Sequence, residues 1–342
     1  MVRSKEKLSI VYAPAKMHAL LAVGEAQISE TRHKTSTTTS TVVARRSSDL
    51  LHFVWFTAKP TMRELPHAIG RCSIARHLEL NPSRTALLWI IGEDARPTVA
   101  PPLTTMHPRV EVRATTRSEI LGGSVLARWL APRTANCTDA YGQLTPQSRS
   151  GSYQDLLRLA LINSHGGTYL DLDELPLAPL PAGDWVSQQL GHGRGADATP
   201  PFNNAAFAMT PGHPCVGALL EAADRTLRSC RFRTFWGMFG PHLFSSLLDP
   251  DWREALGSQP PVAECAGVAR LPPHVFSPIR WNRAKSFYRV SAAFNASWLS
   301  QAAVAGTRAL HLYTSNLGLK GPSQSAAFLE RVARLGLCPF RV

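Results

Sequence analysis

The most informative part of the sequence is residues 153–180, YQDLLRLALINSHGGTYLDLDELPLAPL. Its first half predicts a helix, because apolar residues recur at spacings of three and four. These residues are Leu156, Leu157, Ala160 and Leu161. Gly166 and Gly167 are expected to end the helix, since glycine readily takes the left-handed conformation found just past a helix C-terminus.

Residues 168–170, TYL, predict a short buried strand, and Asp171 and Asp173 follow at its end. On a strand, side chains two residues apart point to the same side, so the two carboxylates are expected to repel one another. A divalent cation removes that repulsion, and carboxylate oxygens suit Mg²⁺ or Mn²⁺. Such a cation also neutralises the charge of a leaving nucleotide diphosphate. The pattern therefore predicts a nucleotide-diphosphate site; for an isolated Asp-x-Asp, the alternative is a solvated acidic loop.

A wider set of residues resembles a known family motif, which reads approximately Ser-Asp-x-x-Arg, a hydrophobic stretch and Gly-Gly-x-Tyr-x-Asp-x-Asp. The chain departs from it at Gln154, where the family usually has Ser. The family contains lactosylceramide 4-alpha-galactosyltransferases, alpha-1,4-N-acetylglucosaminyltransferases and yeast initiating mannosyltransferases. The resemblance implies a GT-A-type nucleotide-sugar-binding fold and a metal-dependent glycosyltransferase that retains anomeric configuration. The matching residues are Asp155, Arg158, Gly166, Gly167, Tyr169, Asp171 and Asp173.

The rest of the N-terminal half predicts an α/β fold with a mainly parallel central sheet. Strands are expected at residues 50–56, 86–92 and 110–114, and a helix at 64–79. Strands that alternate with helices pair in parallel. Ligands bind at the carboxyl ends of such strands. Trp55 and the two aspartates all fall at predicted carboxyl ends, so they are expected to share one site.

The resemblance also implies contacts with the sugar donor. It places Trp55 against the nucleotide base, although an apolar aromatic there is equally typical of a core. It implies that Asp155 and Arg158 position the ribose or the sugar. Asn203 and Asn204 lie in a string that resembles the family's Asn-Asn-Ala, and their amides are predicted to bond sugar hydroxyls. The alternative for the asparagine pair is a turn.

Three C-terminal strings extend the resemblance. Residues 235–244 resemble the family's Trp-Gly-x-x-Gly-Pro segment, in which Pro241 is expected to open a helix. Residues 274–288 resemble a Phe-x-Pro-x-x-Trp stretch. Residues 309–317 resemble the string Ala-x-His-Leu-Trp, which makes His311 the candidate third metal ligand beside Asp171 and Asp173. The alternative for His311 is a buried structural histidine.

The function that the resemblance implies is transfer of galactose or N-acetylglucosamine from a UDP-sugar, with Mn²⁺ or Mg²⁺ as cofactor. The acceptor would be a galactose-terminated glycan or glycolipid, joined in alpha-1,4 linkage, as in glycosphingolipid synthesis in the Golgi. Two alternatives remain: a mannosyltransferase that uses GDP-mannose, and a non-catalytic carbohydrate-binding or scaffold protein on the same fold. The Asn203-Asn204 pair and Gly240-Pro241 favour the alpha-1,4 branch.

Composition supports an anionic ligand, because the formal net charge is +13. Residues 1–48 hold 8 Lys/Arg and 3 Asp/Glu, are partly Ser/Thr-rich, and are expected to form a disordered leader or stalk. Residues 49–342 are expected to form the catalytic domain, with the Asp-x-Asp region at about 60–180 and the alpha-1,4-glycosyltransferase region at about 200–335. Nucleic acid is not a predicted partner, since no zinc spacing or helix-turn-helix signature occurs.

Six scattered cysteines form no Cys-x-x-Cys pair, which argues against zinc and leaves the disulfide pairing open. Sequons at Asn136 and Asn295 agree with a luminal glycoprotein. The sequence contains no segment long enough to span a membrane. A Golgi enzyme would carry an N-terminal anchor, so either the chain is truncated, the gene model begins late, or the location differs. Residues 131–152 and 181–201 are predicted loops, and the second is expected to close over the donor.

Overall fold

The computed structural model describes nine segments of the chain. The chain divides into two units, residues 1–44 and 45–342, and every described residue belongs to the second unit. The predicted leader, residues 1–48, lies outside the described residues. The described segments are 49–65, 68–93, 95–127, 146–190, 201–229, 237–250, 263–281, 296–314 and 329–338.

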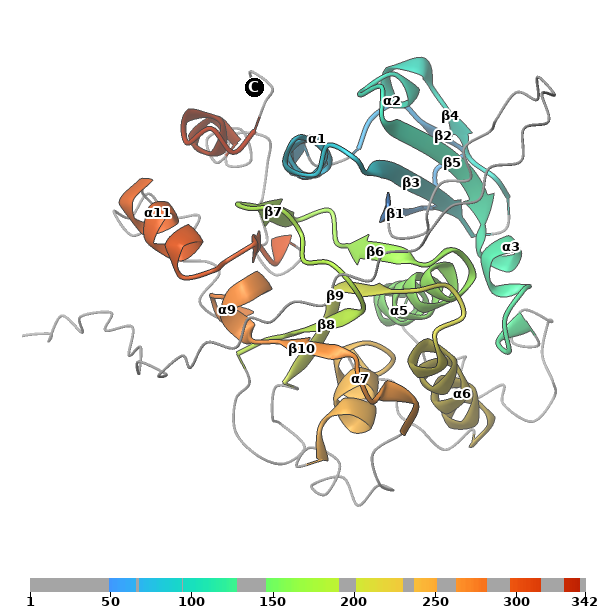
Figure 1. Cartoon of the computed structure of the whole chain (residues 1–342). Coiled ribbons are helices and arrows are strands. Elements are labelled where there is room, and N and C mark those ends of the chain that lie inside the picture. The colour runs from blue at the N-terminus through green and yellow to red at the C-terminus, as the bar shows by residue number, and fades with distance from the viewer. Residues whose placement is uncertain are drawn as a thin grey trace, which may run out of the picture. The chain divides into compact units, whose positions relative to one another are not determined.

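A seven-stranded sheet forms the centre of this unit, with the strand order β10-β8-β9-β6-β1-β3-β5 (Figure 1). β1 pairs in parallel with β3 and β6, and β3 pairs in parallel with β5. β9 alone runs against the others, because it is antiparallel to both β6 and β8. The predicted mainly parallel sheet is therefore confirmed. Its strands are β1 (Leu50–Thr57), β3 (Thr85–Gly92), β5 (Val110–Thr116), β6 (Gly167–Leu170), β8 (Trp185–Gln188), β9 (Phe202–Met209) and β10 (Ala269–Leu271).

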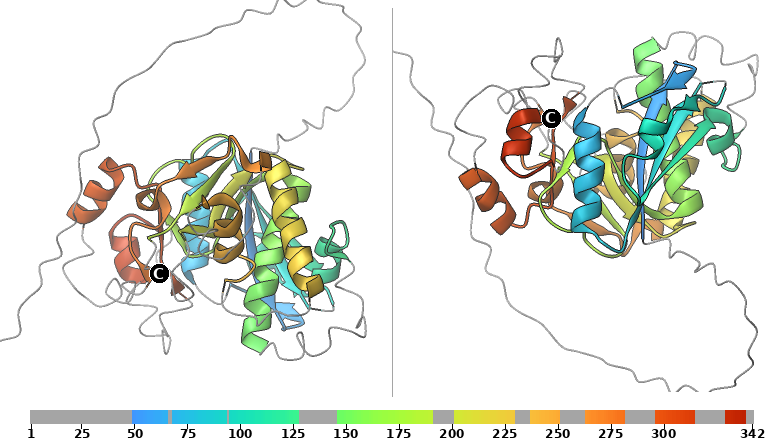
Figure 2. Two further views of the ribbon diagram at one scale, coloured as in Figure 1. Left: turned by 90° about the horizontal axis from the view of Figure 1, so that it is seen from below. Right: turned by 90° about the horizontal axis from the view of Figure 1, so that it is seen from above.

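Helices cover both faces of the sheet (Figure 2). α1 (Ala68–Leu80) packs on one face, while α5 (Pro146–His165) and α6 (Pro214–Ser229) pack on the other. β3 shows why both faces are apolar. Its residues Leu88 and Ile90 belong to the core beneath α1, while Leu87 and Ile91 belong to the core beneath α5 and α6. A strand buried on both faces reads as a continuous apolar run, which is how this strand was predicted.

A small two-stranded sheet brings the C-terminal part of the chain to the Asp-x-Asp segment. β7 (Glu174–Pro176) pairs antiparallel with β11 (Ala309–His311), and His311 lies opposite Glu174 in the register. Because the pairing joins residues far apart in sequence, no local pattern predicts it. The remaining elements are β2 (Thr61–Met62), β4 (Thr98–Val99), α2 (Pro101–Thr104), α3 (Arg117–Leu121), α7 (Pro241–Leu248), the 3-10 helix η3 (Ala263–Cys265), α9 (Pro273–Phe276) and α11 (Ala296–Val304).

The predicted helix boundaries at two motifs are confirmed. α5 ends at His165, and the two glycines that follow have positive φ angles of 63° and 95°. The ring of His52 bonds the carbonyl oxygen of Gly166 at 2.9 Å, which ties this turn to β1. At the second motif, Gly240 is the N-cap residue of α7 and Pro241 stands in its first turn.

Two predicted loops are wrong in part. Residues 185–188 form strand β8 of the large sheet, and Trp185 is fully buried against Phe276. This strand is four residues long and is flanked by Gly and Pro, so the turn signals concealed it. The predicted lid is therefore not a loop at residues 185–188, and residues 191–200 lie outside the described residues. Similarly, α5 begins at Pro146, within the loop predicted at 131–152.

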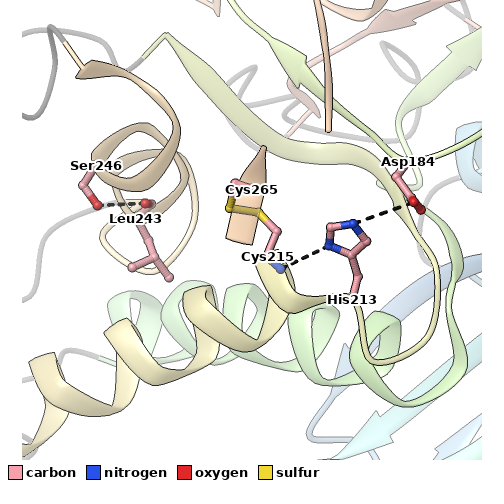
Figure 3. Close-up of a disulfide and its surroundings, with 6 residues drawn as sticks. All are labelled: Asp184, His213, Cys215, Leu243, Ser246 and Cys265. Atoms are coloured by element: carbon pink, nitrogen blue, oxygen red, sulfur yellow. Dashed lines mark hydrogen bonds and ion pairs between the residues drawn. A yellow bond between two sulfur atoms is a disulfide. The ribbon is translucent and has the colours of Figure 1, made fainter. Parts of the chain in front are cut away.

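Two disulfides join distant segments. Cys72 of α1 is bonded to Cys338. Cys215 of α6 is bonded to Cys265, and Figure 3 shows this second disulfide. Beside the second disulfide, His213 accepts the backbone N–H of Cys215 and lies 3.8 Å from a carboxylate oxygen of Asp184. Disulfides form and persist in oxidising compartments. No cysteine in the described segments is unpaired.

The predicted sequons at Asn136 and Asn295 lie outside the described residues, as do Cys137 and Cys230. None of the helices in the described part of the chain combines the length and the apolar character needed to cross a membrane.

Two buried histidines predict a pH-dependent stability. Burial lowers the pKa of His52 and of His77 to about 3, so both stay neutral when folded but take up protons below about pH 6.5 when unfolded. The free energy of unfolding is therefore expected to fall between pH 6.5 and pH 4, by up to about 1.4 kcal/mol per pH unit per histidine. Urea unfolding at pH 7.5 and pH 5.0 measures this. His52→Gln keeps groups that can bond Trp89 and Gly166 and should reduce the slope; equal stability at both pH values would contradict the prediction.

Candidate functional site

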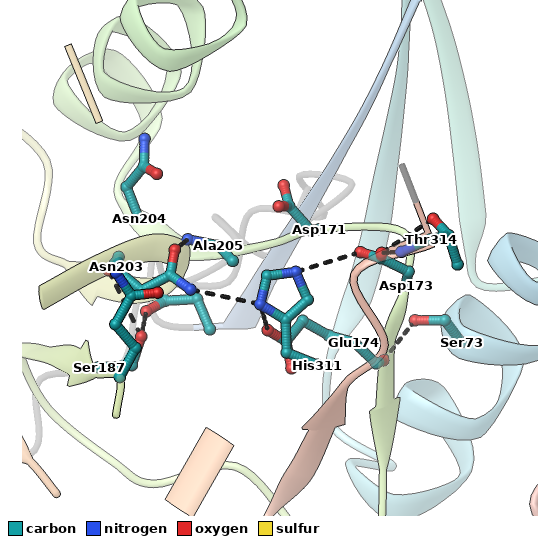
Figure 4. A network of polar contacts seen from close by, with 12 residues as sticks. Ser73, Asp171, Asp173, Glu174, Ser187, Asn203, Asn204, Ala205, His311 and Thr314 are labelled. Atoms are coloured by element: carbon teal, nitrogen blue, oxygen red, sulfur yellow. Dashed lines mark hydrogen bonds and ion pairs between the residues drawn. The ribbon is translucent and has the colours of Figure 1, made fainter. Parts of the chain in front are cut away.

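A turn after β6 positions the two acidic residues. The backbone N–H of Glu174 donates to the carbonyl of Asp171 at 3.0 Å, so residues 171–174 form a tight turn. The prediction that both carboxylates stand on a strand is wrong, because the strand ends at Leu170. The turn nevertheless gathers the predicted group: ligand atoms of Asp171, Asp173 and His311 all lie within 4.8 Å of one another (Figure 4).

Thr314 holds one oxygen of Asp173. Its backbone N–H and its hydroxyl donate to Oδ2 of Asp173 at 2.7 and 2.9 Å. The other oxygen, Oδ1, lies 3.6 Å from Nε2 of His311. Tyr313 has a positive φ of 50° and stacks on His311 with ring centroids 3.9 Å apart. A non-glycine residue in this conformation is strained, and such residues cluster at functional sites.

Arg158 and Tyr169 hold Asp171. The Tyr169 hydroxyl donates to Oδ1 of Asp171 at 2.7 Å, and Nη1 of Arg158 lies 3.2 Å from the same oxygen. Burial raises the pKa of Asp171, and the Arg158 charge opposes that shift. Burial would lower the pKa of Arg158, but its neighbours Asp171, Tyr169 and Asp155 raise it above the usual value. Arg158 therefore stays charged, and its guanidinium also lies over the Tyr169 ring.

The predicted donor contacts Asp155, Asn203 and Asn204 are occupied by internal hydrogen bonds. Nδ2 of Asn204 donates to Oδ1 of Asp155 at 2.8 Å, and Arg158 donates to the carbonyl of Asn204 at 2.9 Å. Nδ2 of Asn203 lies 3.3 Å from Nδ1 of His311. None of these three residues is among those that line the pocket described below. These three residues therefore contact pocket residues but do not line the pocket themselves.

Gly240 packs directly against this buried group. A Cβ atom built on Gly240 would lie 2.7 Å from the Asn204 amide and 2.8 Å from Cγ of Asp155. Only glycine fits such a close approach. The Gly-Pro pair at 240–241 therefore has a packing role that the sequence did not indicate.

A pocket of about 200 Å³ opens over the acidic turn. It includes five predicted site residues, Trp55, Arg158, Asp171, Asp173 and His311. Its lining combines apolar side chains with charged ones, as is usual for ligand pockets. Tyr169, which belongs to the family motif, also lines the pocket. The sequence analysis assigned no site role to the other lining residues, which are Val54, Phe56, Leu65, Ile69, Gly70, Gln154, Leu172 and Thr314.

The side chains of Asp171, Asp173 and His311 suit a divalent cation. Two carboxylates and an imidazole suit Mn²⁺, which accepts both oxygen and nitrogen ligands. Thr314 and Tyr169 already occupy one oxygen of each aspartate, which fixes the carboxylates in place. Without a cation, the two acidic groups and the neighbouring Glu174 would face one another in a partly buried space.

The C-terminal part of the chain matches a family model. Residues 208–340 match the family model described as "Alpha 1,4-glycosyltransferase conserved region". The resemblance predicted from the motifs is thereby confirmed for this part of the chain. The matched region contains Gly240, His311 and Thr314, whereas the Asp-x-Asp segment precedes it.

Two relatives show the same homology at a distance. The chain is 26% identical over 152 residues to human alpha-1,4-N-acetylglucosaminyltransferase, covering 42% of this chain and 40% of that protein. It is 25% identical over 236 residues to lactosylceramide 4-alpha-galactosyltransferase of Rattus norvegicus, covering 66% of this chain and 58% of that protein. The matches thus span about half the length of these relatives.

A solved structure of PaToxG glycosyltransferase covers 64% of this chain and 82% of its own chain. It is 16% identical to this chain and has a TM-score of 0.37. The family assignment therefore rests on the sequence matches.

Proposed function

We propose that this chain is a metal-dependent, retaining glycosyltransferase of the GT-A type that transfers a hexose from a UDP-sugar. The observation that carries the proposal is the convergence of Asp171, Asp173 and His311 at one end of a pocket that also contains Trp55 and Arg158. The family match supports the same reaction class.

In the proposed mechanism, Asp171, Asp173 and His311 hold Mn²⁺ or Mg²⁺. When bound, the cation supplies positive charge to the diphosphate of the leaving nucleotide. Arg158 and Tyr169 keep Asp171 in place, and Thr314 keeps Asp173 in place, so the ligands need little rearrangement as charge develops. We assign no covalent nucleophile.

Trp55 provides the apolar wall against which the nucleotide base would lie. We propose that Asp155, Asn203 and Asn204 act on the donor site indirectly, by fixing Arg158 and His311. The acceptor hydroxyl would be held against the anomeric carbon, which removes an orientation penalty. By analogy with the relatives, the acceptor is a galactose-terminated glycolipid or glycan, the linkage is alpha-1,4 and the compartment is the Golgi lumen.

A donor panel tests the proposal. The purified chain is incubated with UDP-galactose, UDP-N-acetylglucosamine or GDP-mannose, with Mn²⁺ or with EDTA, and release of the nucleoside diphosphate is measured. We expect Mn²⁺-dependent hydrolysis of one of the two UDP-sugars. Hydrolysis of GDP-mannose alone would support the mannosyltransferase alternative. Sugar binding without hydrolysis of any donor would support the non-catalytic alternative.

A further inference from the structure

Glu174 is a buried carboxylate that the fold itself does not explain. Its side chain is 1% exposed, and neither carboxylate oxygen has a hydrogen-bond partner in the described part of the chain. Its nearest acidic neighbours, Asp171 and Asp173, carry the same charge. Leaving a carboxylate buried without a donor is strongly unfavourable, and an orphaned polar group of this kind calls for a specific role.

Two side chains of α1 hold the backbone of Glu174. Ser73 Oγ donates to its backbone carbonyl at 2.7 Å, and Nε2 of His77 lies 3.2 Å from the same oxygen. Glu174 pairs with His311 across the β7–β11 ladder. The side chain is thus directed at the histidine, with Oε1 of Glu174 3.5 Å from Nδ1 of His311 (Figure 4).

His311 needs a particular tautomer to bind a cation through Nε2, the ring nitrogen nearer Asp173. Its proton must then be on Nδ1, and Nδ1–H needs an acceptor. Asn203 cannot be that acceptor, because its oxygen accepts the N–H of Ala205 at 3.0 Å and its NH₂ group faces Nδ1 at 3.3 Å. This NH₂ group donates to Nδ1 only while the ring proton is on Nε2, so binding of a cation at Nε2 requires a different partner for Nδ1. Oε1 of Glu174 lies 3.5 Å from Nδ1 and is an oxygen that can accept the Nδ1–H.

We propose that Glu174 is a positioning residue that accepts the Nδ1–H which His311 carries when its Nε2 binds the cation. This inference rests on the metal site of the proposed function. It assigns to Glu174 the carboxylate–histidine–metal relay by which outer carboxylates orient histidine ligands. It also explains why a buried acid stands at a position where an apolar side chain would be more stable in the absence of metal.

The test compares Glu174→Met, Glu174→Gln and the exposed control Glu221→Gln by calorimetric Mn²⁺ titration and by thermal unfolding in EDTA. Glu174→Met is expected to weaken Mn²⁺ binding about 10- to 100-fold. It is also expected to raise Tm in EDTA by about 5 °C, since it removes an unpaired buried acid. Glu174→Gln retains an acceptor oxygen and should bind Mn²⁺ more tightly than Glu174→Met.

A cycle with His311→Ala makes the result specific. If Glu174 acts through the histidine, Glu174→Met should not change the Mn²⁺ affinity of His311→Ala further. Should Glu174→Met fail to fold, the same cycle is run with Glu174→Gln. The inference is overturned if the Glu174 variants bind Mn²⁺ as tightly as wild type does. It is also overturned if Glu174→Met lowers the Mn²⁺ affinity of His311→Ala as much as it lowers that of wild type. Absence of Mn²⁺ binding to the wild-type chain would overturn the proposed function itself.

Discussion

Asp173→Asn is expected to lower nucleotide-sugar turnover at least about 10³-fold and to abolish its dependence on Mn²⁺. The reason is loss of charge, because the shape of the site should survive. The asparagine oxygen can still accept the N–H and the hydroxyl of Thr314, which now bond Oδ2 of Asp173. The variant then differs from wild type mainly in having one negative charge fewer to hold the cation.

Turnover of the preferred donor over a range of Mn²⁺ concentrations measures this effect. Asp184→Asn is the matched control, since an asparagine there can still accept the N–H of Thr210 and Asp184 is not among the residues that line the pocket. Wild-type turnover in Asp173→Asn, or a similar loss in the control, would remove Asp173 from the proposed site.

Arg158→Met is expected to lower the free energy of unfolding by about 3–5 kcal/mol, the usual cost of breaking a buried charge group from one side. Arg158 lies 3.2 Å from Asp171 and 3.6 Å from Asp155, and all three side chains are mostly buried. Methionine would leave two buried acids without their cation and would leave the Asn204 carbonyl without its donor. Donor turnover should fall as well, because Asp171 loses a partner.

Chemical denaturation of Arg158→Met and Arg225→Met measures the difference. Arg225 pairs with Glu221 on the exposed surface of α6, with both side chains about two-thirds exposed. Exposed pairs contribute about 0–1 kcal/mol, so this control should unfold close to wild type. Equal unfolding midpoints for the two variants would show that the Arg158 cluster does not stabilise the fold.

The strands and helices that the sequence predicted best are those with long apolar patterns. β1 and β3 lie within one residue of their predicted bounds. β8 was missed because four residues between Gly and Pro signals are too few for a period to show. The β7–β11 pairing was missed because pairing across most of the chain leaves no local trace.

For the site, local chemistry predicted the acidic pair, and family resemblance added Trp55, Arg158 and His311. The pocket includes all of these. The roles of these residues remain predictions. Asn203 and Asn204 show the limit of the method, because an amide that holds another side chain and one that faces a ligand have the same sequence signature.

Thr314 and Tyr313 illustrate a different limit. Their contacts with Asp173 and His311 depend on a backbone reversal at Tyr313, and a tyrosine in sequence gives no sign of a positive φ. The sequence did not indicate a special role for Glu174, because a third acidic residue directly after Asp-x-Asp is expected to be solvent-exposed. Only its burial in the structure distinguishes it.

The most direct measurement is a calorimetric titration of UDP into the purified chain, with Mn²⁺ and with EDTA. The account predicts saturable binding of UDP in Mn²⁺, and binding at least about tenfold weaker in EDTA or in the Asp171→Asn/Asp173→Asn double variant. UDP affinity that is the same in all three cases would contradict the account, and so would a chain that binds neither Mn²⁺ nor UDP.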